Sequence, residues 1–276
     1  MASHRLIGWI YFDPAAIENY TALGVDNGLG YYIASRGAPL APAGHQAVAA
    51  AFYTIHPVFV EVCIGAAAAG TTFKAITDAR NLAASEGLRR FVPEICDDLA
   101  ELSGPLWQAV DAMSASGHVL FAAHRQWHRP SDPLVSAWLA INAVREFRGD
   151  THFTLLAAED LSATQAGLLH NAFLNYPDEW IPRSRGADDD AIAVALSDLE
   201  SRGLAAAGIV NDEGLALRER IEARTNELTE RAWRILGEEA TLRFVELVEP
   251  VGQRLLDRID ETAGPDWMPA ARTRRP

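Results

Sequence analysis

The stretch that decides the fold is residues 188–218, which read DDDAIAVALSDLESRGLAAAGIVNDEGLALR. Three aspartates open it, and acidic side chains favour the positive N-terminal end of a helix. Apolar residues then recur at helical spacing as far as Gly203, a residue type that commonly caps the end of a helix. Two short apolar runs, 203–206 and 209–211, predict a small β-hairpin before a long helix that begins near Gly214.

The segment before this stretch adds one more helix, because Ser162 is a good N-cap for residues 163–169. Residues 151–260 therefore run through a Ser-capped helix, a second helix, a hairpin and two long helices. In this order they resemble the MarR-like winged helix-turn-helix proteins. The resemblance implies a recognition helix at 188–204, a wing at 205–213, and C-terminal helices that help to form a dimerisation layer in that family.

The whole chain is also similar to an actinobacterial family of helix-turn-helix proteins. The shared segments are RGAPL at 36–40, FY at 52–53 with HP at 56–57, LFAA at 120–123 and FRGDxH at 147–152. The chain is about twice as long as a single MarR-type subunit. We therefore expect a mostly α-helical pseudo-dimer, in which a MarR-like winged helix with a small β-hairpin wing is fused to a helical N-terminal half. A degenerate winged helix is one form that this half could take.

Three parts are expected along the chain: a helical N-terminal half at 1–130, the winged helix with its C-terminal helical layer at 131–268, and a disordered tail at 269–276. Asp132 followed by Pro133 predicts the start of a helix that reaches about Asp150, where a further helix is expected to begin. Residues 91–113 are expected to form one continuous helix.

The charge distribution argues against DNA binding. The net charge is −13, and residues 150–276 hold 24 acidic against 14 basic side chains. The aspartates at 188–190 would face the DNA backbone, which carries about one negative charge per 1.7 Å. The wing ends in NDE at 211–213, and only Arg183 and Arg185 lie near the recognition helix. Although the aspartates also suit a helix N-terminus, nucleic acid is not an expected partner.

The helix around residues 138–152 carries the most informative polar pattern. Four of its residues are spaced three, four and three apart: Asn142, Arg145, Gly149 and His152. On a continuous helix they form one stripe beside Arg148, and arginines with a histidine suit a carboxylate or phenolate ligand. In MarR-type proteins aromatic acids bind between the DNA-binding lobe and the dimer layer, so the resemblance places this stripe at such a site. The alternative is a salt-bridge network in which Arg148 pairs with Asp150 or Glu146.

Three more side chains are candidates to line the same ligand site: Tyr53, His56 and Trp138. His56 precedes a proline, and it could equally satisfy a loop carbonyl. Most of the seven tryptophans are expected in the core rather than around a ligand.

A metal ion and an organic cofactor are both unexpected. Three histidines fall within eleven residues: His118, His124 and His128. The last two have a spacing that suits a metal on a helix, but Pro130 and Pro133 follow closely and no acidic ligand lies between them. The sequence has no phosphate loop, dinucleotide fingerprint or short cysteine spacing. No apolar run reaches the roughly 20 residues of a membrane span, so we expect a cytoplasmic protein.

These patterns favour three functions in turn. The first is binding of an aromatic or anionic metabolite by a protein derived from a MarR-like regulator that has lost DNA binding. The second is a cofactor-independent enzyme of secondary metabolism, of cyclase or isomerase type. In such an enzyme His152 would be the general acid or base, Asp150 would hold its tautomer, and Arg148 would stabilise an oxyanion. The third is a MarR-like transcriptional regulator. As a pseudo-dimer the chain would act as a monomer, with a homodimer as the alternative.

Overall fold

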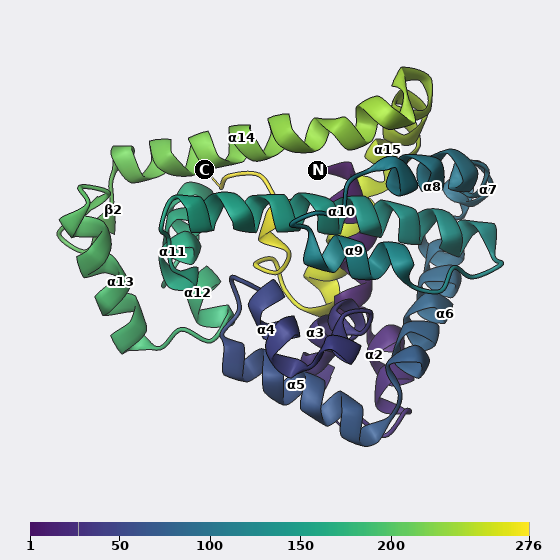
Figure 1. Ribbon diagram of the computed structural model, residues 1–276, viewed down its shortest axis with the longest axis horizontal. Helices are drawn as coiled ribbons and strands as arrows, with labels where there is room; N and C mark the ends of the chain where they lie inside the picture. The colour runs from purple at the N-terminus through teal and green to yellow at the C-terminus, as the bar shows by residue number, and fades with distance from the viewer. Residues whose placement is uncertain (27, 276) are drawn as a thin grey trace.

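The longest helix, α10 (Pro133–Ala158), lies at the centre of the molecule. The structure is a computed structural model that describes residues 1–26 and 28–275. In Figure 1, α10 crosses the middle of the molecule below α14 (Asp212–Leu236), and helices of the first half of the chain lie around it. Every residue from 134 to 147 is buried, so this helix needs partners on all sides.

The start of α10 is as the sequence predicts, but its continuation is not. The Asp132 carboxylate accepts the backbone N–H of Leu134 at 3.0 Å, and Pro133 occupies the first helical position. The second helix start predicted at Asp150 is wrong, because α10 runs unbroken past it to Ala158. Asp150 is instead buried within the helix, and its carboxylate bonds to the backbone of another segment.

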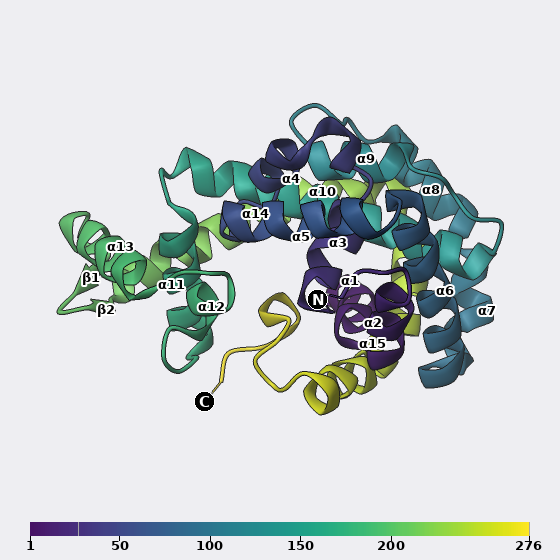
Figure 2. The same cartoon turned by 90° about the horizontal axis from the view of Figure 1, so that it is seen from below.

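Helices from both ends of the chain surround α10 (Figure 2). In chain order they are α1 (Ala2–Gly8), α2 (Pro14–Thr21), α3 (Tyr31–Gly37), α4 (His45–Ala51), α5 (Pro57–Gly70), α6 (Phe73–Phe91), α7 (Cys96–Glu101), α8 (Ser103–Ala112), α9 (Val119–Gln126) and α15 (Glu238–Thr262). Short 3-10 turns occur at Trp9–Phe12, Gly28–Gly30, Ala41–Ala43, Pro93–Ile95 and Pro269–Ala271. Because α1 packs against both α10 and α15, the first and last helices of the chain lie side by side.

One hydrophobic core joins these helices across the whole length of the chain. Leu6, Trp138 and Leu255 are fully buried members of the same cluster. The Trp138 indole donates to the Leu6 carbonyl at 3.1 Å, which ties α10 to α1. The division expected near residue 130 therefore does not separate two cores, since α10 and α15 complete the core of the first half.

A smaller core lies at one end of the molecule, in a part that we call the distal lobe, residues 161–217 (Figures 1 and 2). Its elements are α11 (Ala163–Leu174), α12 (Trp180–Ser184), α13 (Asp189–Ser201), β1 (Ala205–Ala206), β2 (Ile209–Val210) and the first turns of α14. Leu168, Leu199 and Leu217 are buried together in this core. Ser162 begins α11 with a reciprocal capping box, which confirms the predicted Ser-capped helix.

The predicted hairpin is present, with two residues in each strand. β1 pairs antiparallel with β2, and Ala206 lies opposite Ile209. Gly203 has a φ of +72°, so the predicted glycine turns the chain out of α13 in a left-handed conformation. A Cβ on Gly214 would lie only 2.4 Å from the Leu204 carbonyl oxygen, so a glycine is needed for α14 to begin this close to the hairpin.

The single helix expected over residues 91–113 is wrong. α6 ends at Phe91, and Val92 adopts a φ of −141°, since a residue before a proline is disfavoured in a helix. A second break at Leu102 separates α7 from α8. Both short helices pack against α10, so the breaks let the chain follow the central helix.

The tail expected to be disordered packs against the rest of the molecule over residues 269–275, and Pro276 lies outside the described residues. Ala271 is fully buried, and its carbonyl accepts a hydrogen bond from an arginine of α1 at 3.2 Å. The backbone N–H of Arg275 donates to Leu174 of the distal lobe at 3.1 Å. The composition of the tail suggested solvation, but its backbone and side chains find partners in elements far away in the sequence.

Among the described residues, no single helix is both long and apolar enough to cross a membrane. The consecutive helices α5 and α6 meet that criterion only together, and they are bent by 96° at the break between them. Each packs against other helices, α5 against α3 and α4, and α6 against α2 and α10.

Candidate functional site

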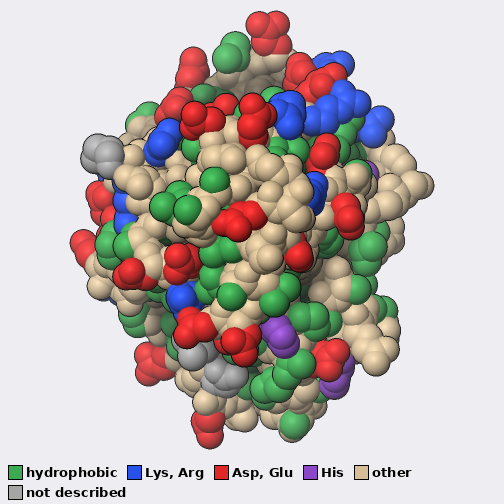
Figure 3. All heavy atoms as spheres, turned by 90° about the vertical axis from the view of Figure 1, so that its left-hand side faces the viewer, with side chains coloured by type: hydrophobic (Ala, Val, Ile, Leu, Met, Phe, Trp, Pro, Cys, Tyr) green, Lys and Arg blue, Asp and Glu red, His purple; other side chains and the backbone are tan. Residues whose placement is uncertain are grey.

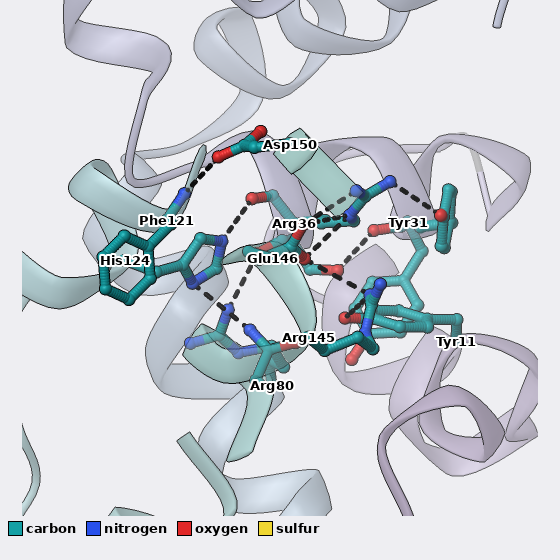
Figure 4. Close-up of polar contacts among 12 residues, drawn as sticks. Tyr11, Tyr31, Arg36, Arg80, Phe121, His124, Arg145, Glu146 and Asp150 are labelled. Atoms are coloured by element: carbon teal, nitrogen blue, oxygen red, sulfur yellow. Dashed lines mark hydrogen bonds and ion pairs between the residues drawn. The ribbon is translucent and has the colours of Figure 1, made fainter. Parts of the chain in front are cut away.

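α10 carries a buried network of polar side chains, made of Arg36, His124, Asn142, Arg145 and Glu146. Arg36 of α3 donates through Nε and Nη2 to the Glu146 carboxylate, at 2.8 and 2.7 Å (Figure 4). The two side chains are 5% and 0% exposed, so the pair is almost completely removed from water. Burial alone would raise the pKa of Glu146, but Arg145 and Arg36 together hold it well below its ordinary value.

His124 and Asn142 extend the buried network without adding charge. His124 Nε2 donates to the Arg36 carbonyl at 2.9 Å, and the Asn142 amide donates to His124 Nδ1 at 3.2 Å. This pattern requires a neutral imidazole, and burial lowers the pKa of His124 to about 4. Asn142, a ligand candidate by its spacing, is thus inaccessible and already engaged in the core.

Arg145 and Trp138, two further ligand candidates, also lie in the closed interior. Arg145 is 3.3 Å from Glu146 and reaches the Tyr11 hydroxyl at 3.4 Å. Its Nε is buried with no hydrogen-bond partner among the described residues. Trp138 is 0% exposed and bonds to the backbone of α1. In this part of α10 the predicted stripe belongs to a salt-bridge network, with Arg36 as a partner that the sequence pattern does not indicate.

Asp150 fastens α9 to α10 and does not reach His152. Its Oδ2 accepts the backbone N–H of Phe121, in the first turns of α9, at 2.9 Å (Figure 4). Burial raises the pKa of Asp150 to about 7. His152 lies two residues further on, nearly on the opposite face of the helix, and its Nδ1 contacts the Thr225 hydroxyl at 3.0 Å. The expected pairing of Asp150 with His152 is therefore wrong.

A second group of charged side chains lies where α10 and α14 meet the distal lobe. We call it the basic cluster, and its members are Arg148, His152, His170, Arg185 and Arg218. They come from α10, α11, the segment after α12, and α14. All five side chains are half-buried, so a solute can still reach them. All three arginines lower the pKa values of both histidines, which places the five groups close together.

The basic cluster is only partly balanced by acidic side chains. Glu222 of α14 accepts a hydrogen bond from Arg148 and lies 3.3 Å from Arg218. Arg148 also donates to the Asn226 side chain at 3.0 Å. Within residues 1–26 and 28–275, the guanidinium of Arg185 and the imidazole of His170 have no ion pair or hydrogen bond. The cluster therefore contains cationic capacity that the protein itself does not use.

Burial works against each free charge in the basic cluster. It lowers the pKa of His152 to about 4, and Arg148 adds to the effect. It also lowers the pKa of His170 well below the ordinary value, and that of Arg185 as well. His4 of α1, which is close enough to feel the charge of Arg148, has a pKa lowered by burial in the same way. Desolvated cations without a counter-charge are costly, and a bound anion would relieve that cost.

The loop between α4 and α5 supports the basic cluster through its backbone. The His56 N–H donates to the Arg185 carbonyl at 2.9 Å, while the His56 side chain is exposed. The Tyr53 hydroxyl donates to the Leu161 carbonyl, and its ring stacks on Phe153 at 5.7 Å. Tyr53 also borders an open groove of about 590 Å³ on the distal lobe. These two predicted ligand residues therefore act beside the cluster rather than as members of it.

Of the site residues predicted from the sequence, Arg148 and His152 lie in the basic cluster. Sequence reasoning missed His170 and Arg218, and it considered Arg185 only as a charge near DNA. Each of these three stands alone in its own helix or loop, so no spacing within one element marks it. Only the packing of the distal lobe against α10 and α14 brings them together.

The three closely spaced histidines serve different parts of the structure. His118 stacks on Phe147 at 4.2 Å and contacts the Thr151 hydroxyl at 3.1 Å. His124 belongs to the buried network, and His128 follows the end of α9. In the part of the chain that the structure describes, no group of three or more His, Cys, Asp or Glu side chains is placed to hold a metal ion.

The N-terminal end of α13 is acidic and faces outward. Asp188 accepts the Ala191 backbone N–H at 2.8 Å, which makes it the N-cap. The exposed Arg183 is 2.7 Å from Asp189 and 3.4 Å from Glu179, so its charge is already neutralised. Figure 3 views the end of the molecule that carries the distal lobe. It shows acidic side chains scattered over this end, with the largest group of basic side chains near the upper edge.

Comparison with known proteins identifies the kind of chain this is. No curated protein and no solved structure matches it. The sequence model of a family described as a helix-turn-helix family matches residues 1–262, which is nearly the whole chain. The basic cluster, the buried network and the distal lobe all lie within the matched region, and the chain belongs to this helix-turn-helix family.

Proposed function

We propose that this helix-turn-helix protein binds a small anionic or phenolic metabolite at the basic cluster, and that its distal lobe has lost DNA binding. The observation that carries the proposal is the unpaired, desolvated guanidinium of Arg185 among four other basic side chains. It stands in a protein whose net charge is −13. A charge kept unpaired at a cost to stability is typical of a ligand site rather than of a structural ion pair.

The form of the fold that we propose is a MarR-like winged helix. In this interpretation α13 is the recognition helix, β1 and β2 form the wing, and α14 with α15 forms the C-terminal layer. The order of the elements supports it, together with the caps at Ser162, Asp188 and Gly203. The N-terminal half would take the place of the second subunit of a dimer, on the grounds of chain length.

The motif Arg148-Gly149-Asp150-x-His152 has a physical interpretation in this proposal. Arg148 and His152 belong to the basic cluster, where Glu222 and Thr225 of α14 hold them. Asp150, on another face of the same turns, fastens α9. The enzyme alternative is weaker, because the carboxylate that would orient His152 is engaged elsewhere.

The outer face of the distal lobe supports the loss of DNA binding. α13 begins with acidic residues, and its neighbour Arg183 is paired with Asp189. No lysine or arginine occurs in residues 203–213, which span the hairpin. Proteins that bind DNA gain much of their affinity from basic side chains placed against phosphates, and this face has few to offer.

Thermal unfolding of the full chain in the presence of aromatic carboxylic acids and phenols tests the proposal. We expect at least one ligand to raise the Tm, with an affinity that falls about tenfold or more in Arg148→Ala and in His152→Ala. Arg243→Ala is the control, because this exposed arginine pairs with Asp98 and Glu101 away from the cluster. Ligand binding that both cluster variants leave untouched would contradict the proposed site. Tight, sequence-dependent binding in a DNA mobility-shift assay at low salt would contradict the loss of DNA binding.

A further inference from the structure

The basic cluster has more positive charge than a single carboxylate ligand would balance. Arg148, Arg185 and Arg218 each carry a permanent positive charge, and Glu222 is the carboxylate that pairs with two of them. Glu219 also acts on Arg218, but from an exposed position where water and salt screen it. A ligand with one negative charge would leave a surplus, whereas a ligand with two would balance the three arginines.

The cluster also offers more hydrogen-bond donors than a carboxylate can use. The guanidinium of Arg185 has every N–H group free of printed partners among the described residues, and so does the imidazole of His170. The Thr225 hydroxyl donates to the Ile221 carbonyl at 2.7 Å, so it accepts from His152 Nδ1 and leaves His152 Nε2 open. A carboxylate presents two oxygens to such donors, and a phosphate monoester presents three.

We propose that the basic cluster binds a phosphate monoester, held as a dianion by Arg148, Arg185 and Arg218 with the two histidines beside it. This ligand class rests on the proposed function and narrows it. The Phe173 ring lies under the Arg218 guanidinium at 3.9 Å and gives the organic part of a monoester an apolar neighbour.

A bound dianion would change the protonation of both imidazoles. In the unliganded protein, burial and the three arginines of the cluster keep His152 and His170 neutral, and Glu222 opposes this at His152. An opposite charge nearby favours the protonated imidazole, so a phosphate among these groups reverses the balance. Binding near neutral pH should therefore take up protons from solution.

Isothermal titration calorimetry on the full chain, near pH 7 and at low chloride, tests the proposal with phenyl phosphate, inorganic phosphate and benzoate. We expect phenyl phosphate to bind about tenfold or more tightly than benzoate, and more tightly than inorganic phosphate. Titrations in two buffers of different ionisation enthalpy should show proton uptake with phenyl phosphate.

Two neighbouring arginines provide a matched pair of variants. Arg185→Ala should weaken phenyl phosphate binding about tenfold or more, because it removes the unpaired cation of the cluster. Arg183→Ala lies two positions away in the same segment, but this side chain is exposed and paired with Asp189, so binding should be unchanged. Glu222→Gln should tighten binding, because it removes the paired negative charge.

The outcomes separate the ligand class from the proposed function. Benzoate binding as tightly as phenyl phosphate, with loss of both in Arg185→Ala, would overturn the phosphate ligand and leave the proposed function standing. Equal affinity for phenyl phosphate and inorganic phosphate would overturn the monoester in favour of free phosphate. Phenyl phosphate binding that Arg185→Ala and Arg183→Ala affect equally would overturn the assignment to the cluster. Failure to bind this or any other small anion or phenol would overturn both proposals.

Discussion

The two groups of arginines along α10 differ in how their charge is balanced. In the buried network, Glu146 is 2.7 Å from Arg36 and 3.3 Å from Arg145, so the arginines share a carboxylate that water cannot reach. In the basic cluster, Arg185 has no such partner among the described residues, and the side chains keep some exposure. The first arrangement is complete without a ligand and therefore supports the fold. The second is incomplete, which is the condition for binding something else.

Removing the Glu146 carboxylate should have the largest effect on folding. Glu146→Ala leaves Arg36 and Arg145 buried without their counter-ion, and we expect the free energy of unfolding to fall by about 3–5 kcal/mol. Urea unfolding followed by circular dichroism measures this change. Arg254→Ala is the control, since it breaks an exposed ion pair with Glu94 and should alter stability little. A loss no greater than that of the control would remove the structural half of the contrast.

Asp150 should make stability depend on pH to a smaller extent. Burial raises its pKa from 3.8 to about 7, so between these values the folded chain keeps a proton that the unfolded chain has lost. The resulting stabilisation is full below about pH 4 and is lost as the pH rises to about 7. Asp150→Asn still offers an oxygen to the Phe121 N–H but cannot ionise.

Urea unfolding at two pH values measures this effect. Between about pH 5 and pH 8, Asp150→Asn should lose about 1–3 kcal/mol less stability than the wild type. The histidines with lowered pKa values contribute equally to both proteins, so the difference between them isolates Asp150. Parallel pH profiles for the two proteins would mean that this carboxyl group titrates normally.

Arg185→Leu should have the smallest effect on folding and the opposite sign. It removes a desolvated charge that has no partner, so we expect the free energy of unfolding to stay within about 0.5 kcal/mol or to rise by up to about 1 kcal/mol. Addition of phenyl phosphate should raise the Tm of the wild type and leave that of the variant unchanged. If Arg185→Leu proved as destabilising as Glu146→Ala, the basic cluster would be a structural feature like the buried network.

Sequence prediction succeeded where a residue acts on its near neighbours in the chain. Asp132, Ser162 and Asp188 each accept a backbone N–H in the first turn of their own helices, and Gly203 turns the chain after α13. It failed at Asp150, whose partner Phe121 is 29 residues away, because capping rules consider only the helix that a residue begins.

The candidate site was predicted only in part for a related reason. Helical spacing groups Asn142, Arg145 and His152 on one stripe, but it does not say where along α10 the stripe leaves the core. The structure shows that other helices enclose Asn142 and Arg145, whereas His152 reaches the junction with the distal lobe. Which part of a stripe faces a ligand thus depends on where neighbouring helices end.

The sequence by itself determined the helical character of the chain, the small hairpin after Gly203 and its order of helix-turn-helix elements. These features depend on backbone hydrogen bonds and caps that form within a few residues. The tertiary structure alone decided that Glu146 pairs with Arg36, which is 110 residues away, and that Arg185 joins Arg148 without a carboxylate of its own. The strength of an ion pair depends on the distance and burial of side chains from different helices, and local spacing specifies neither.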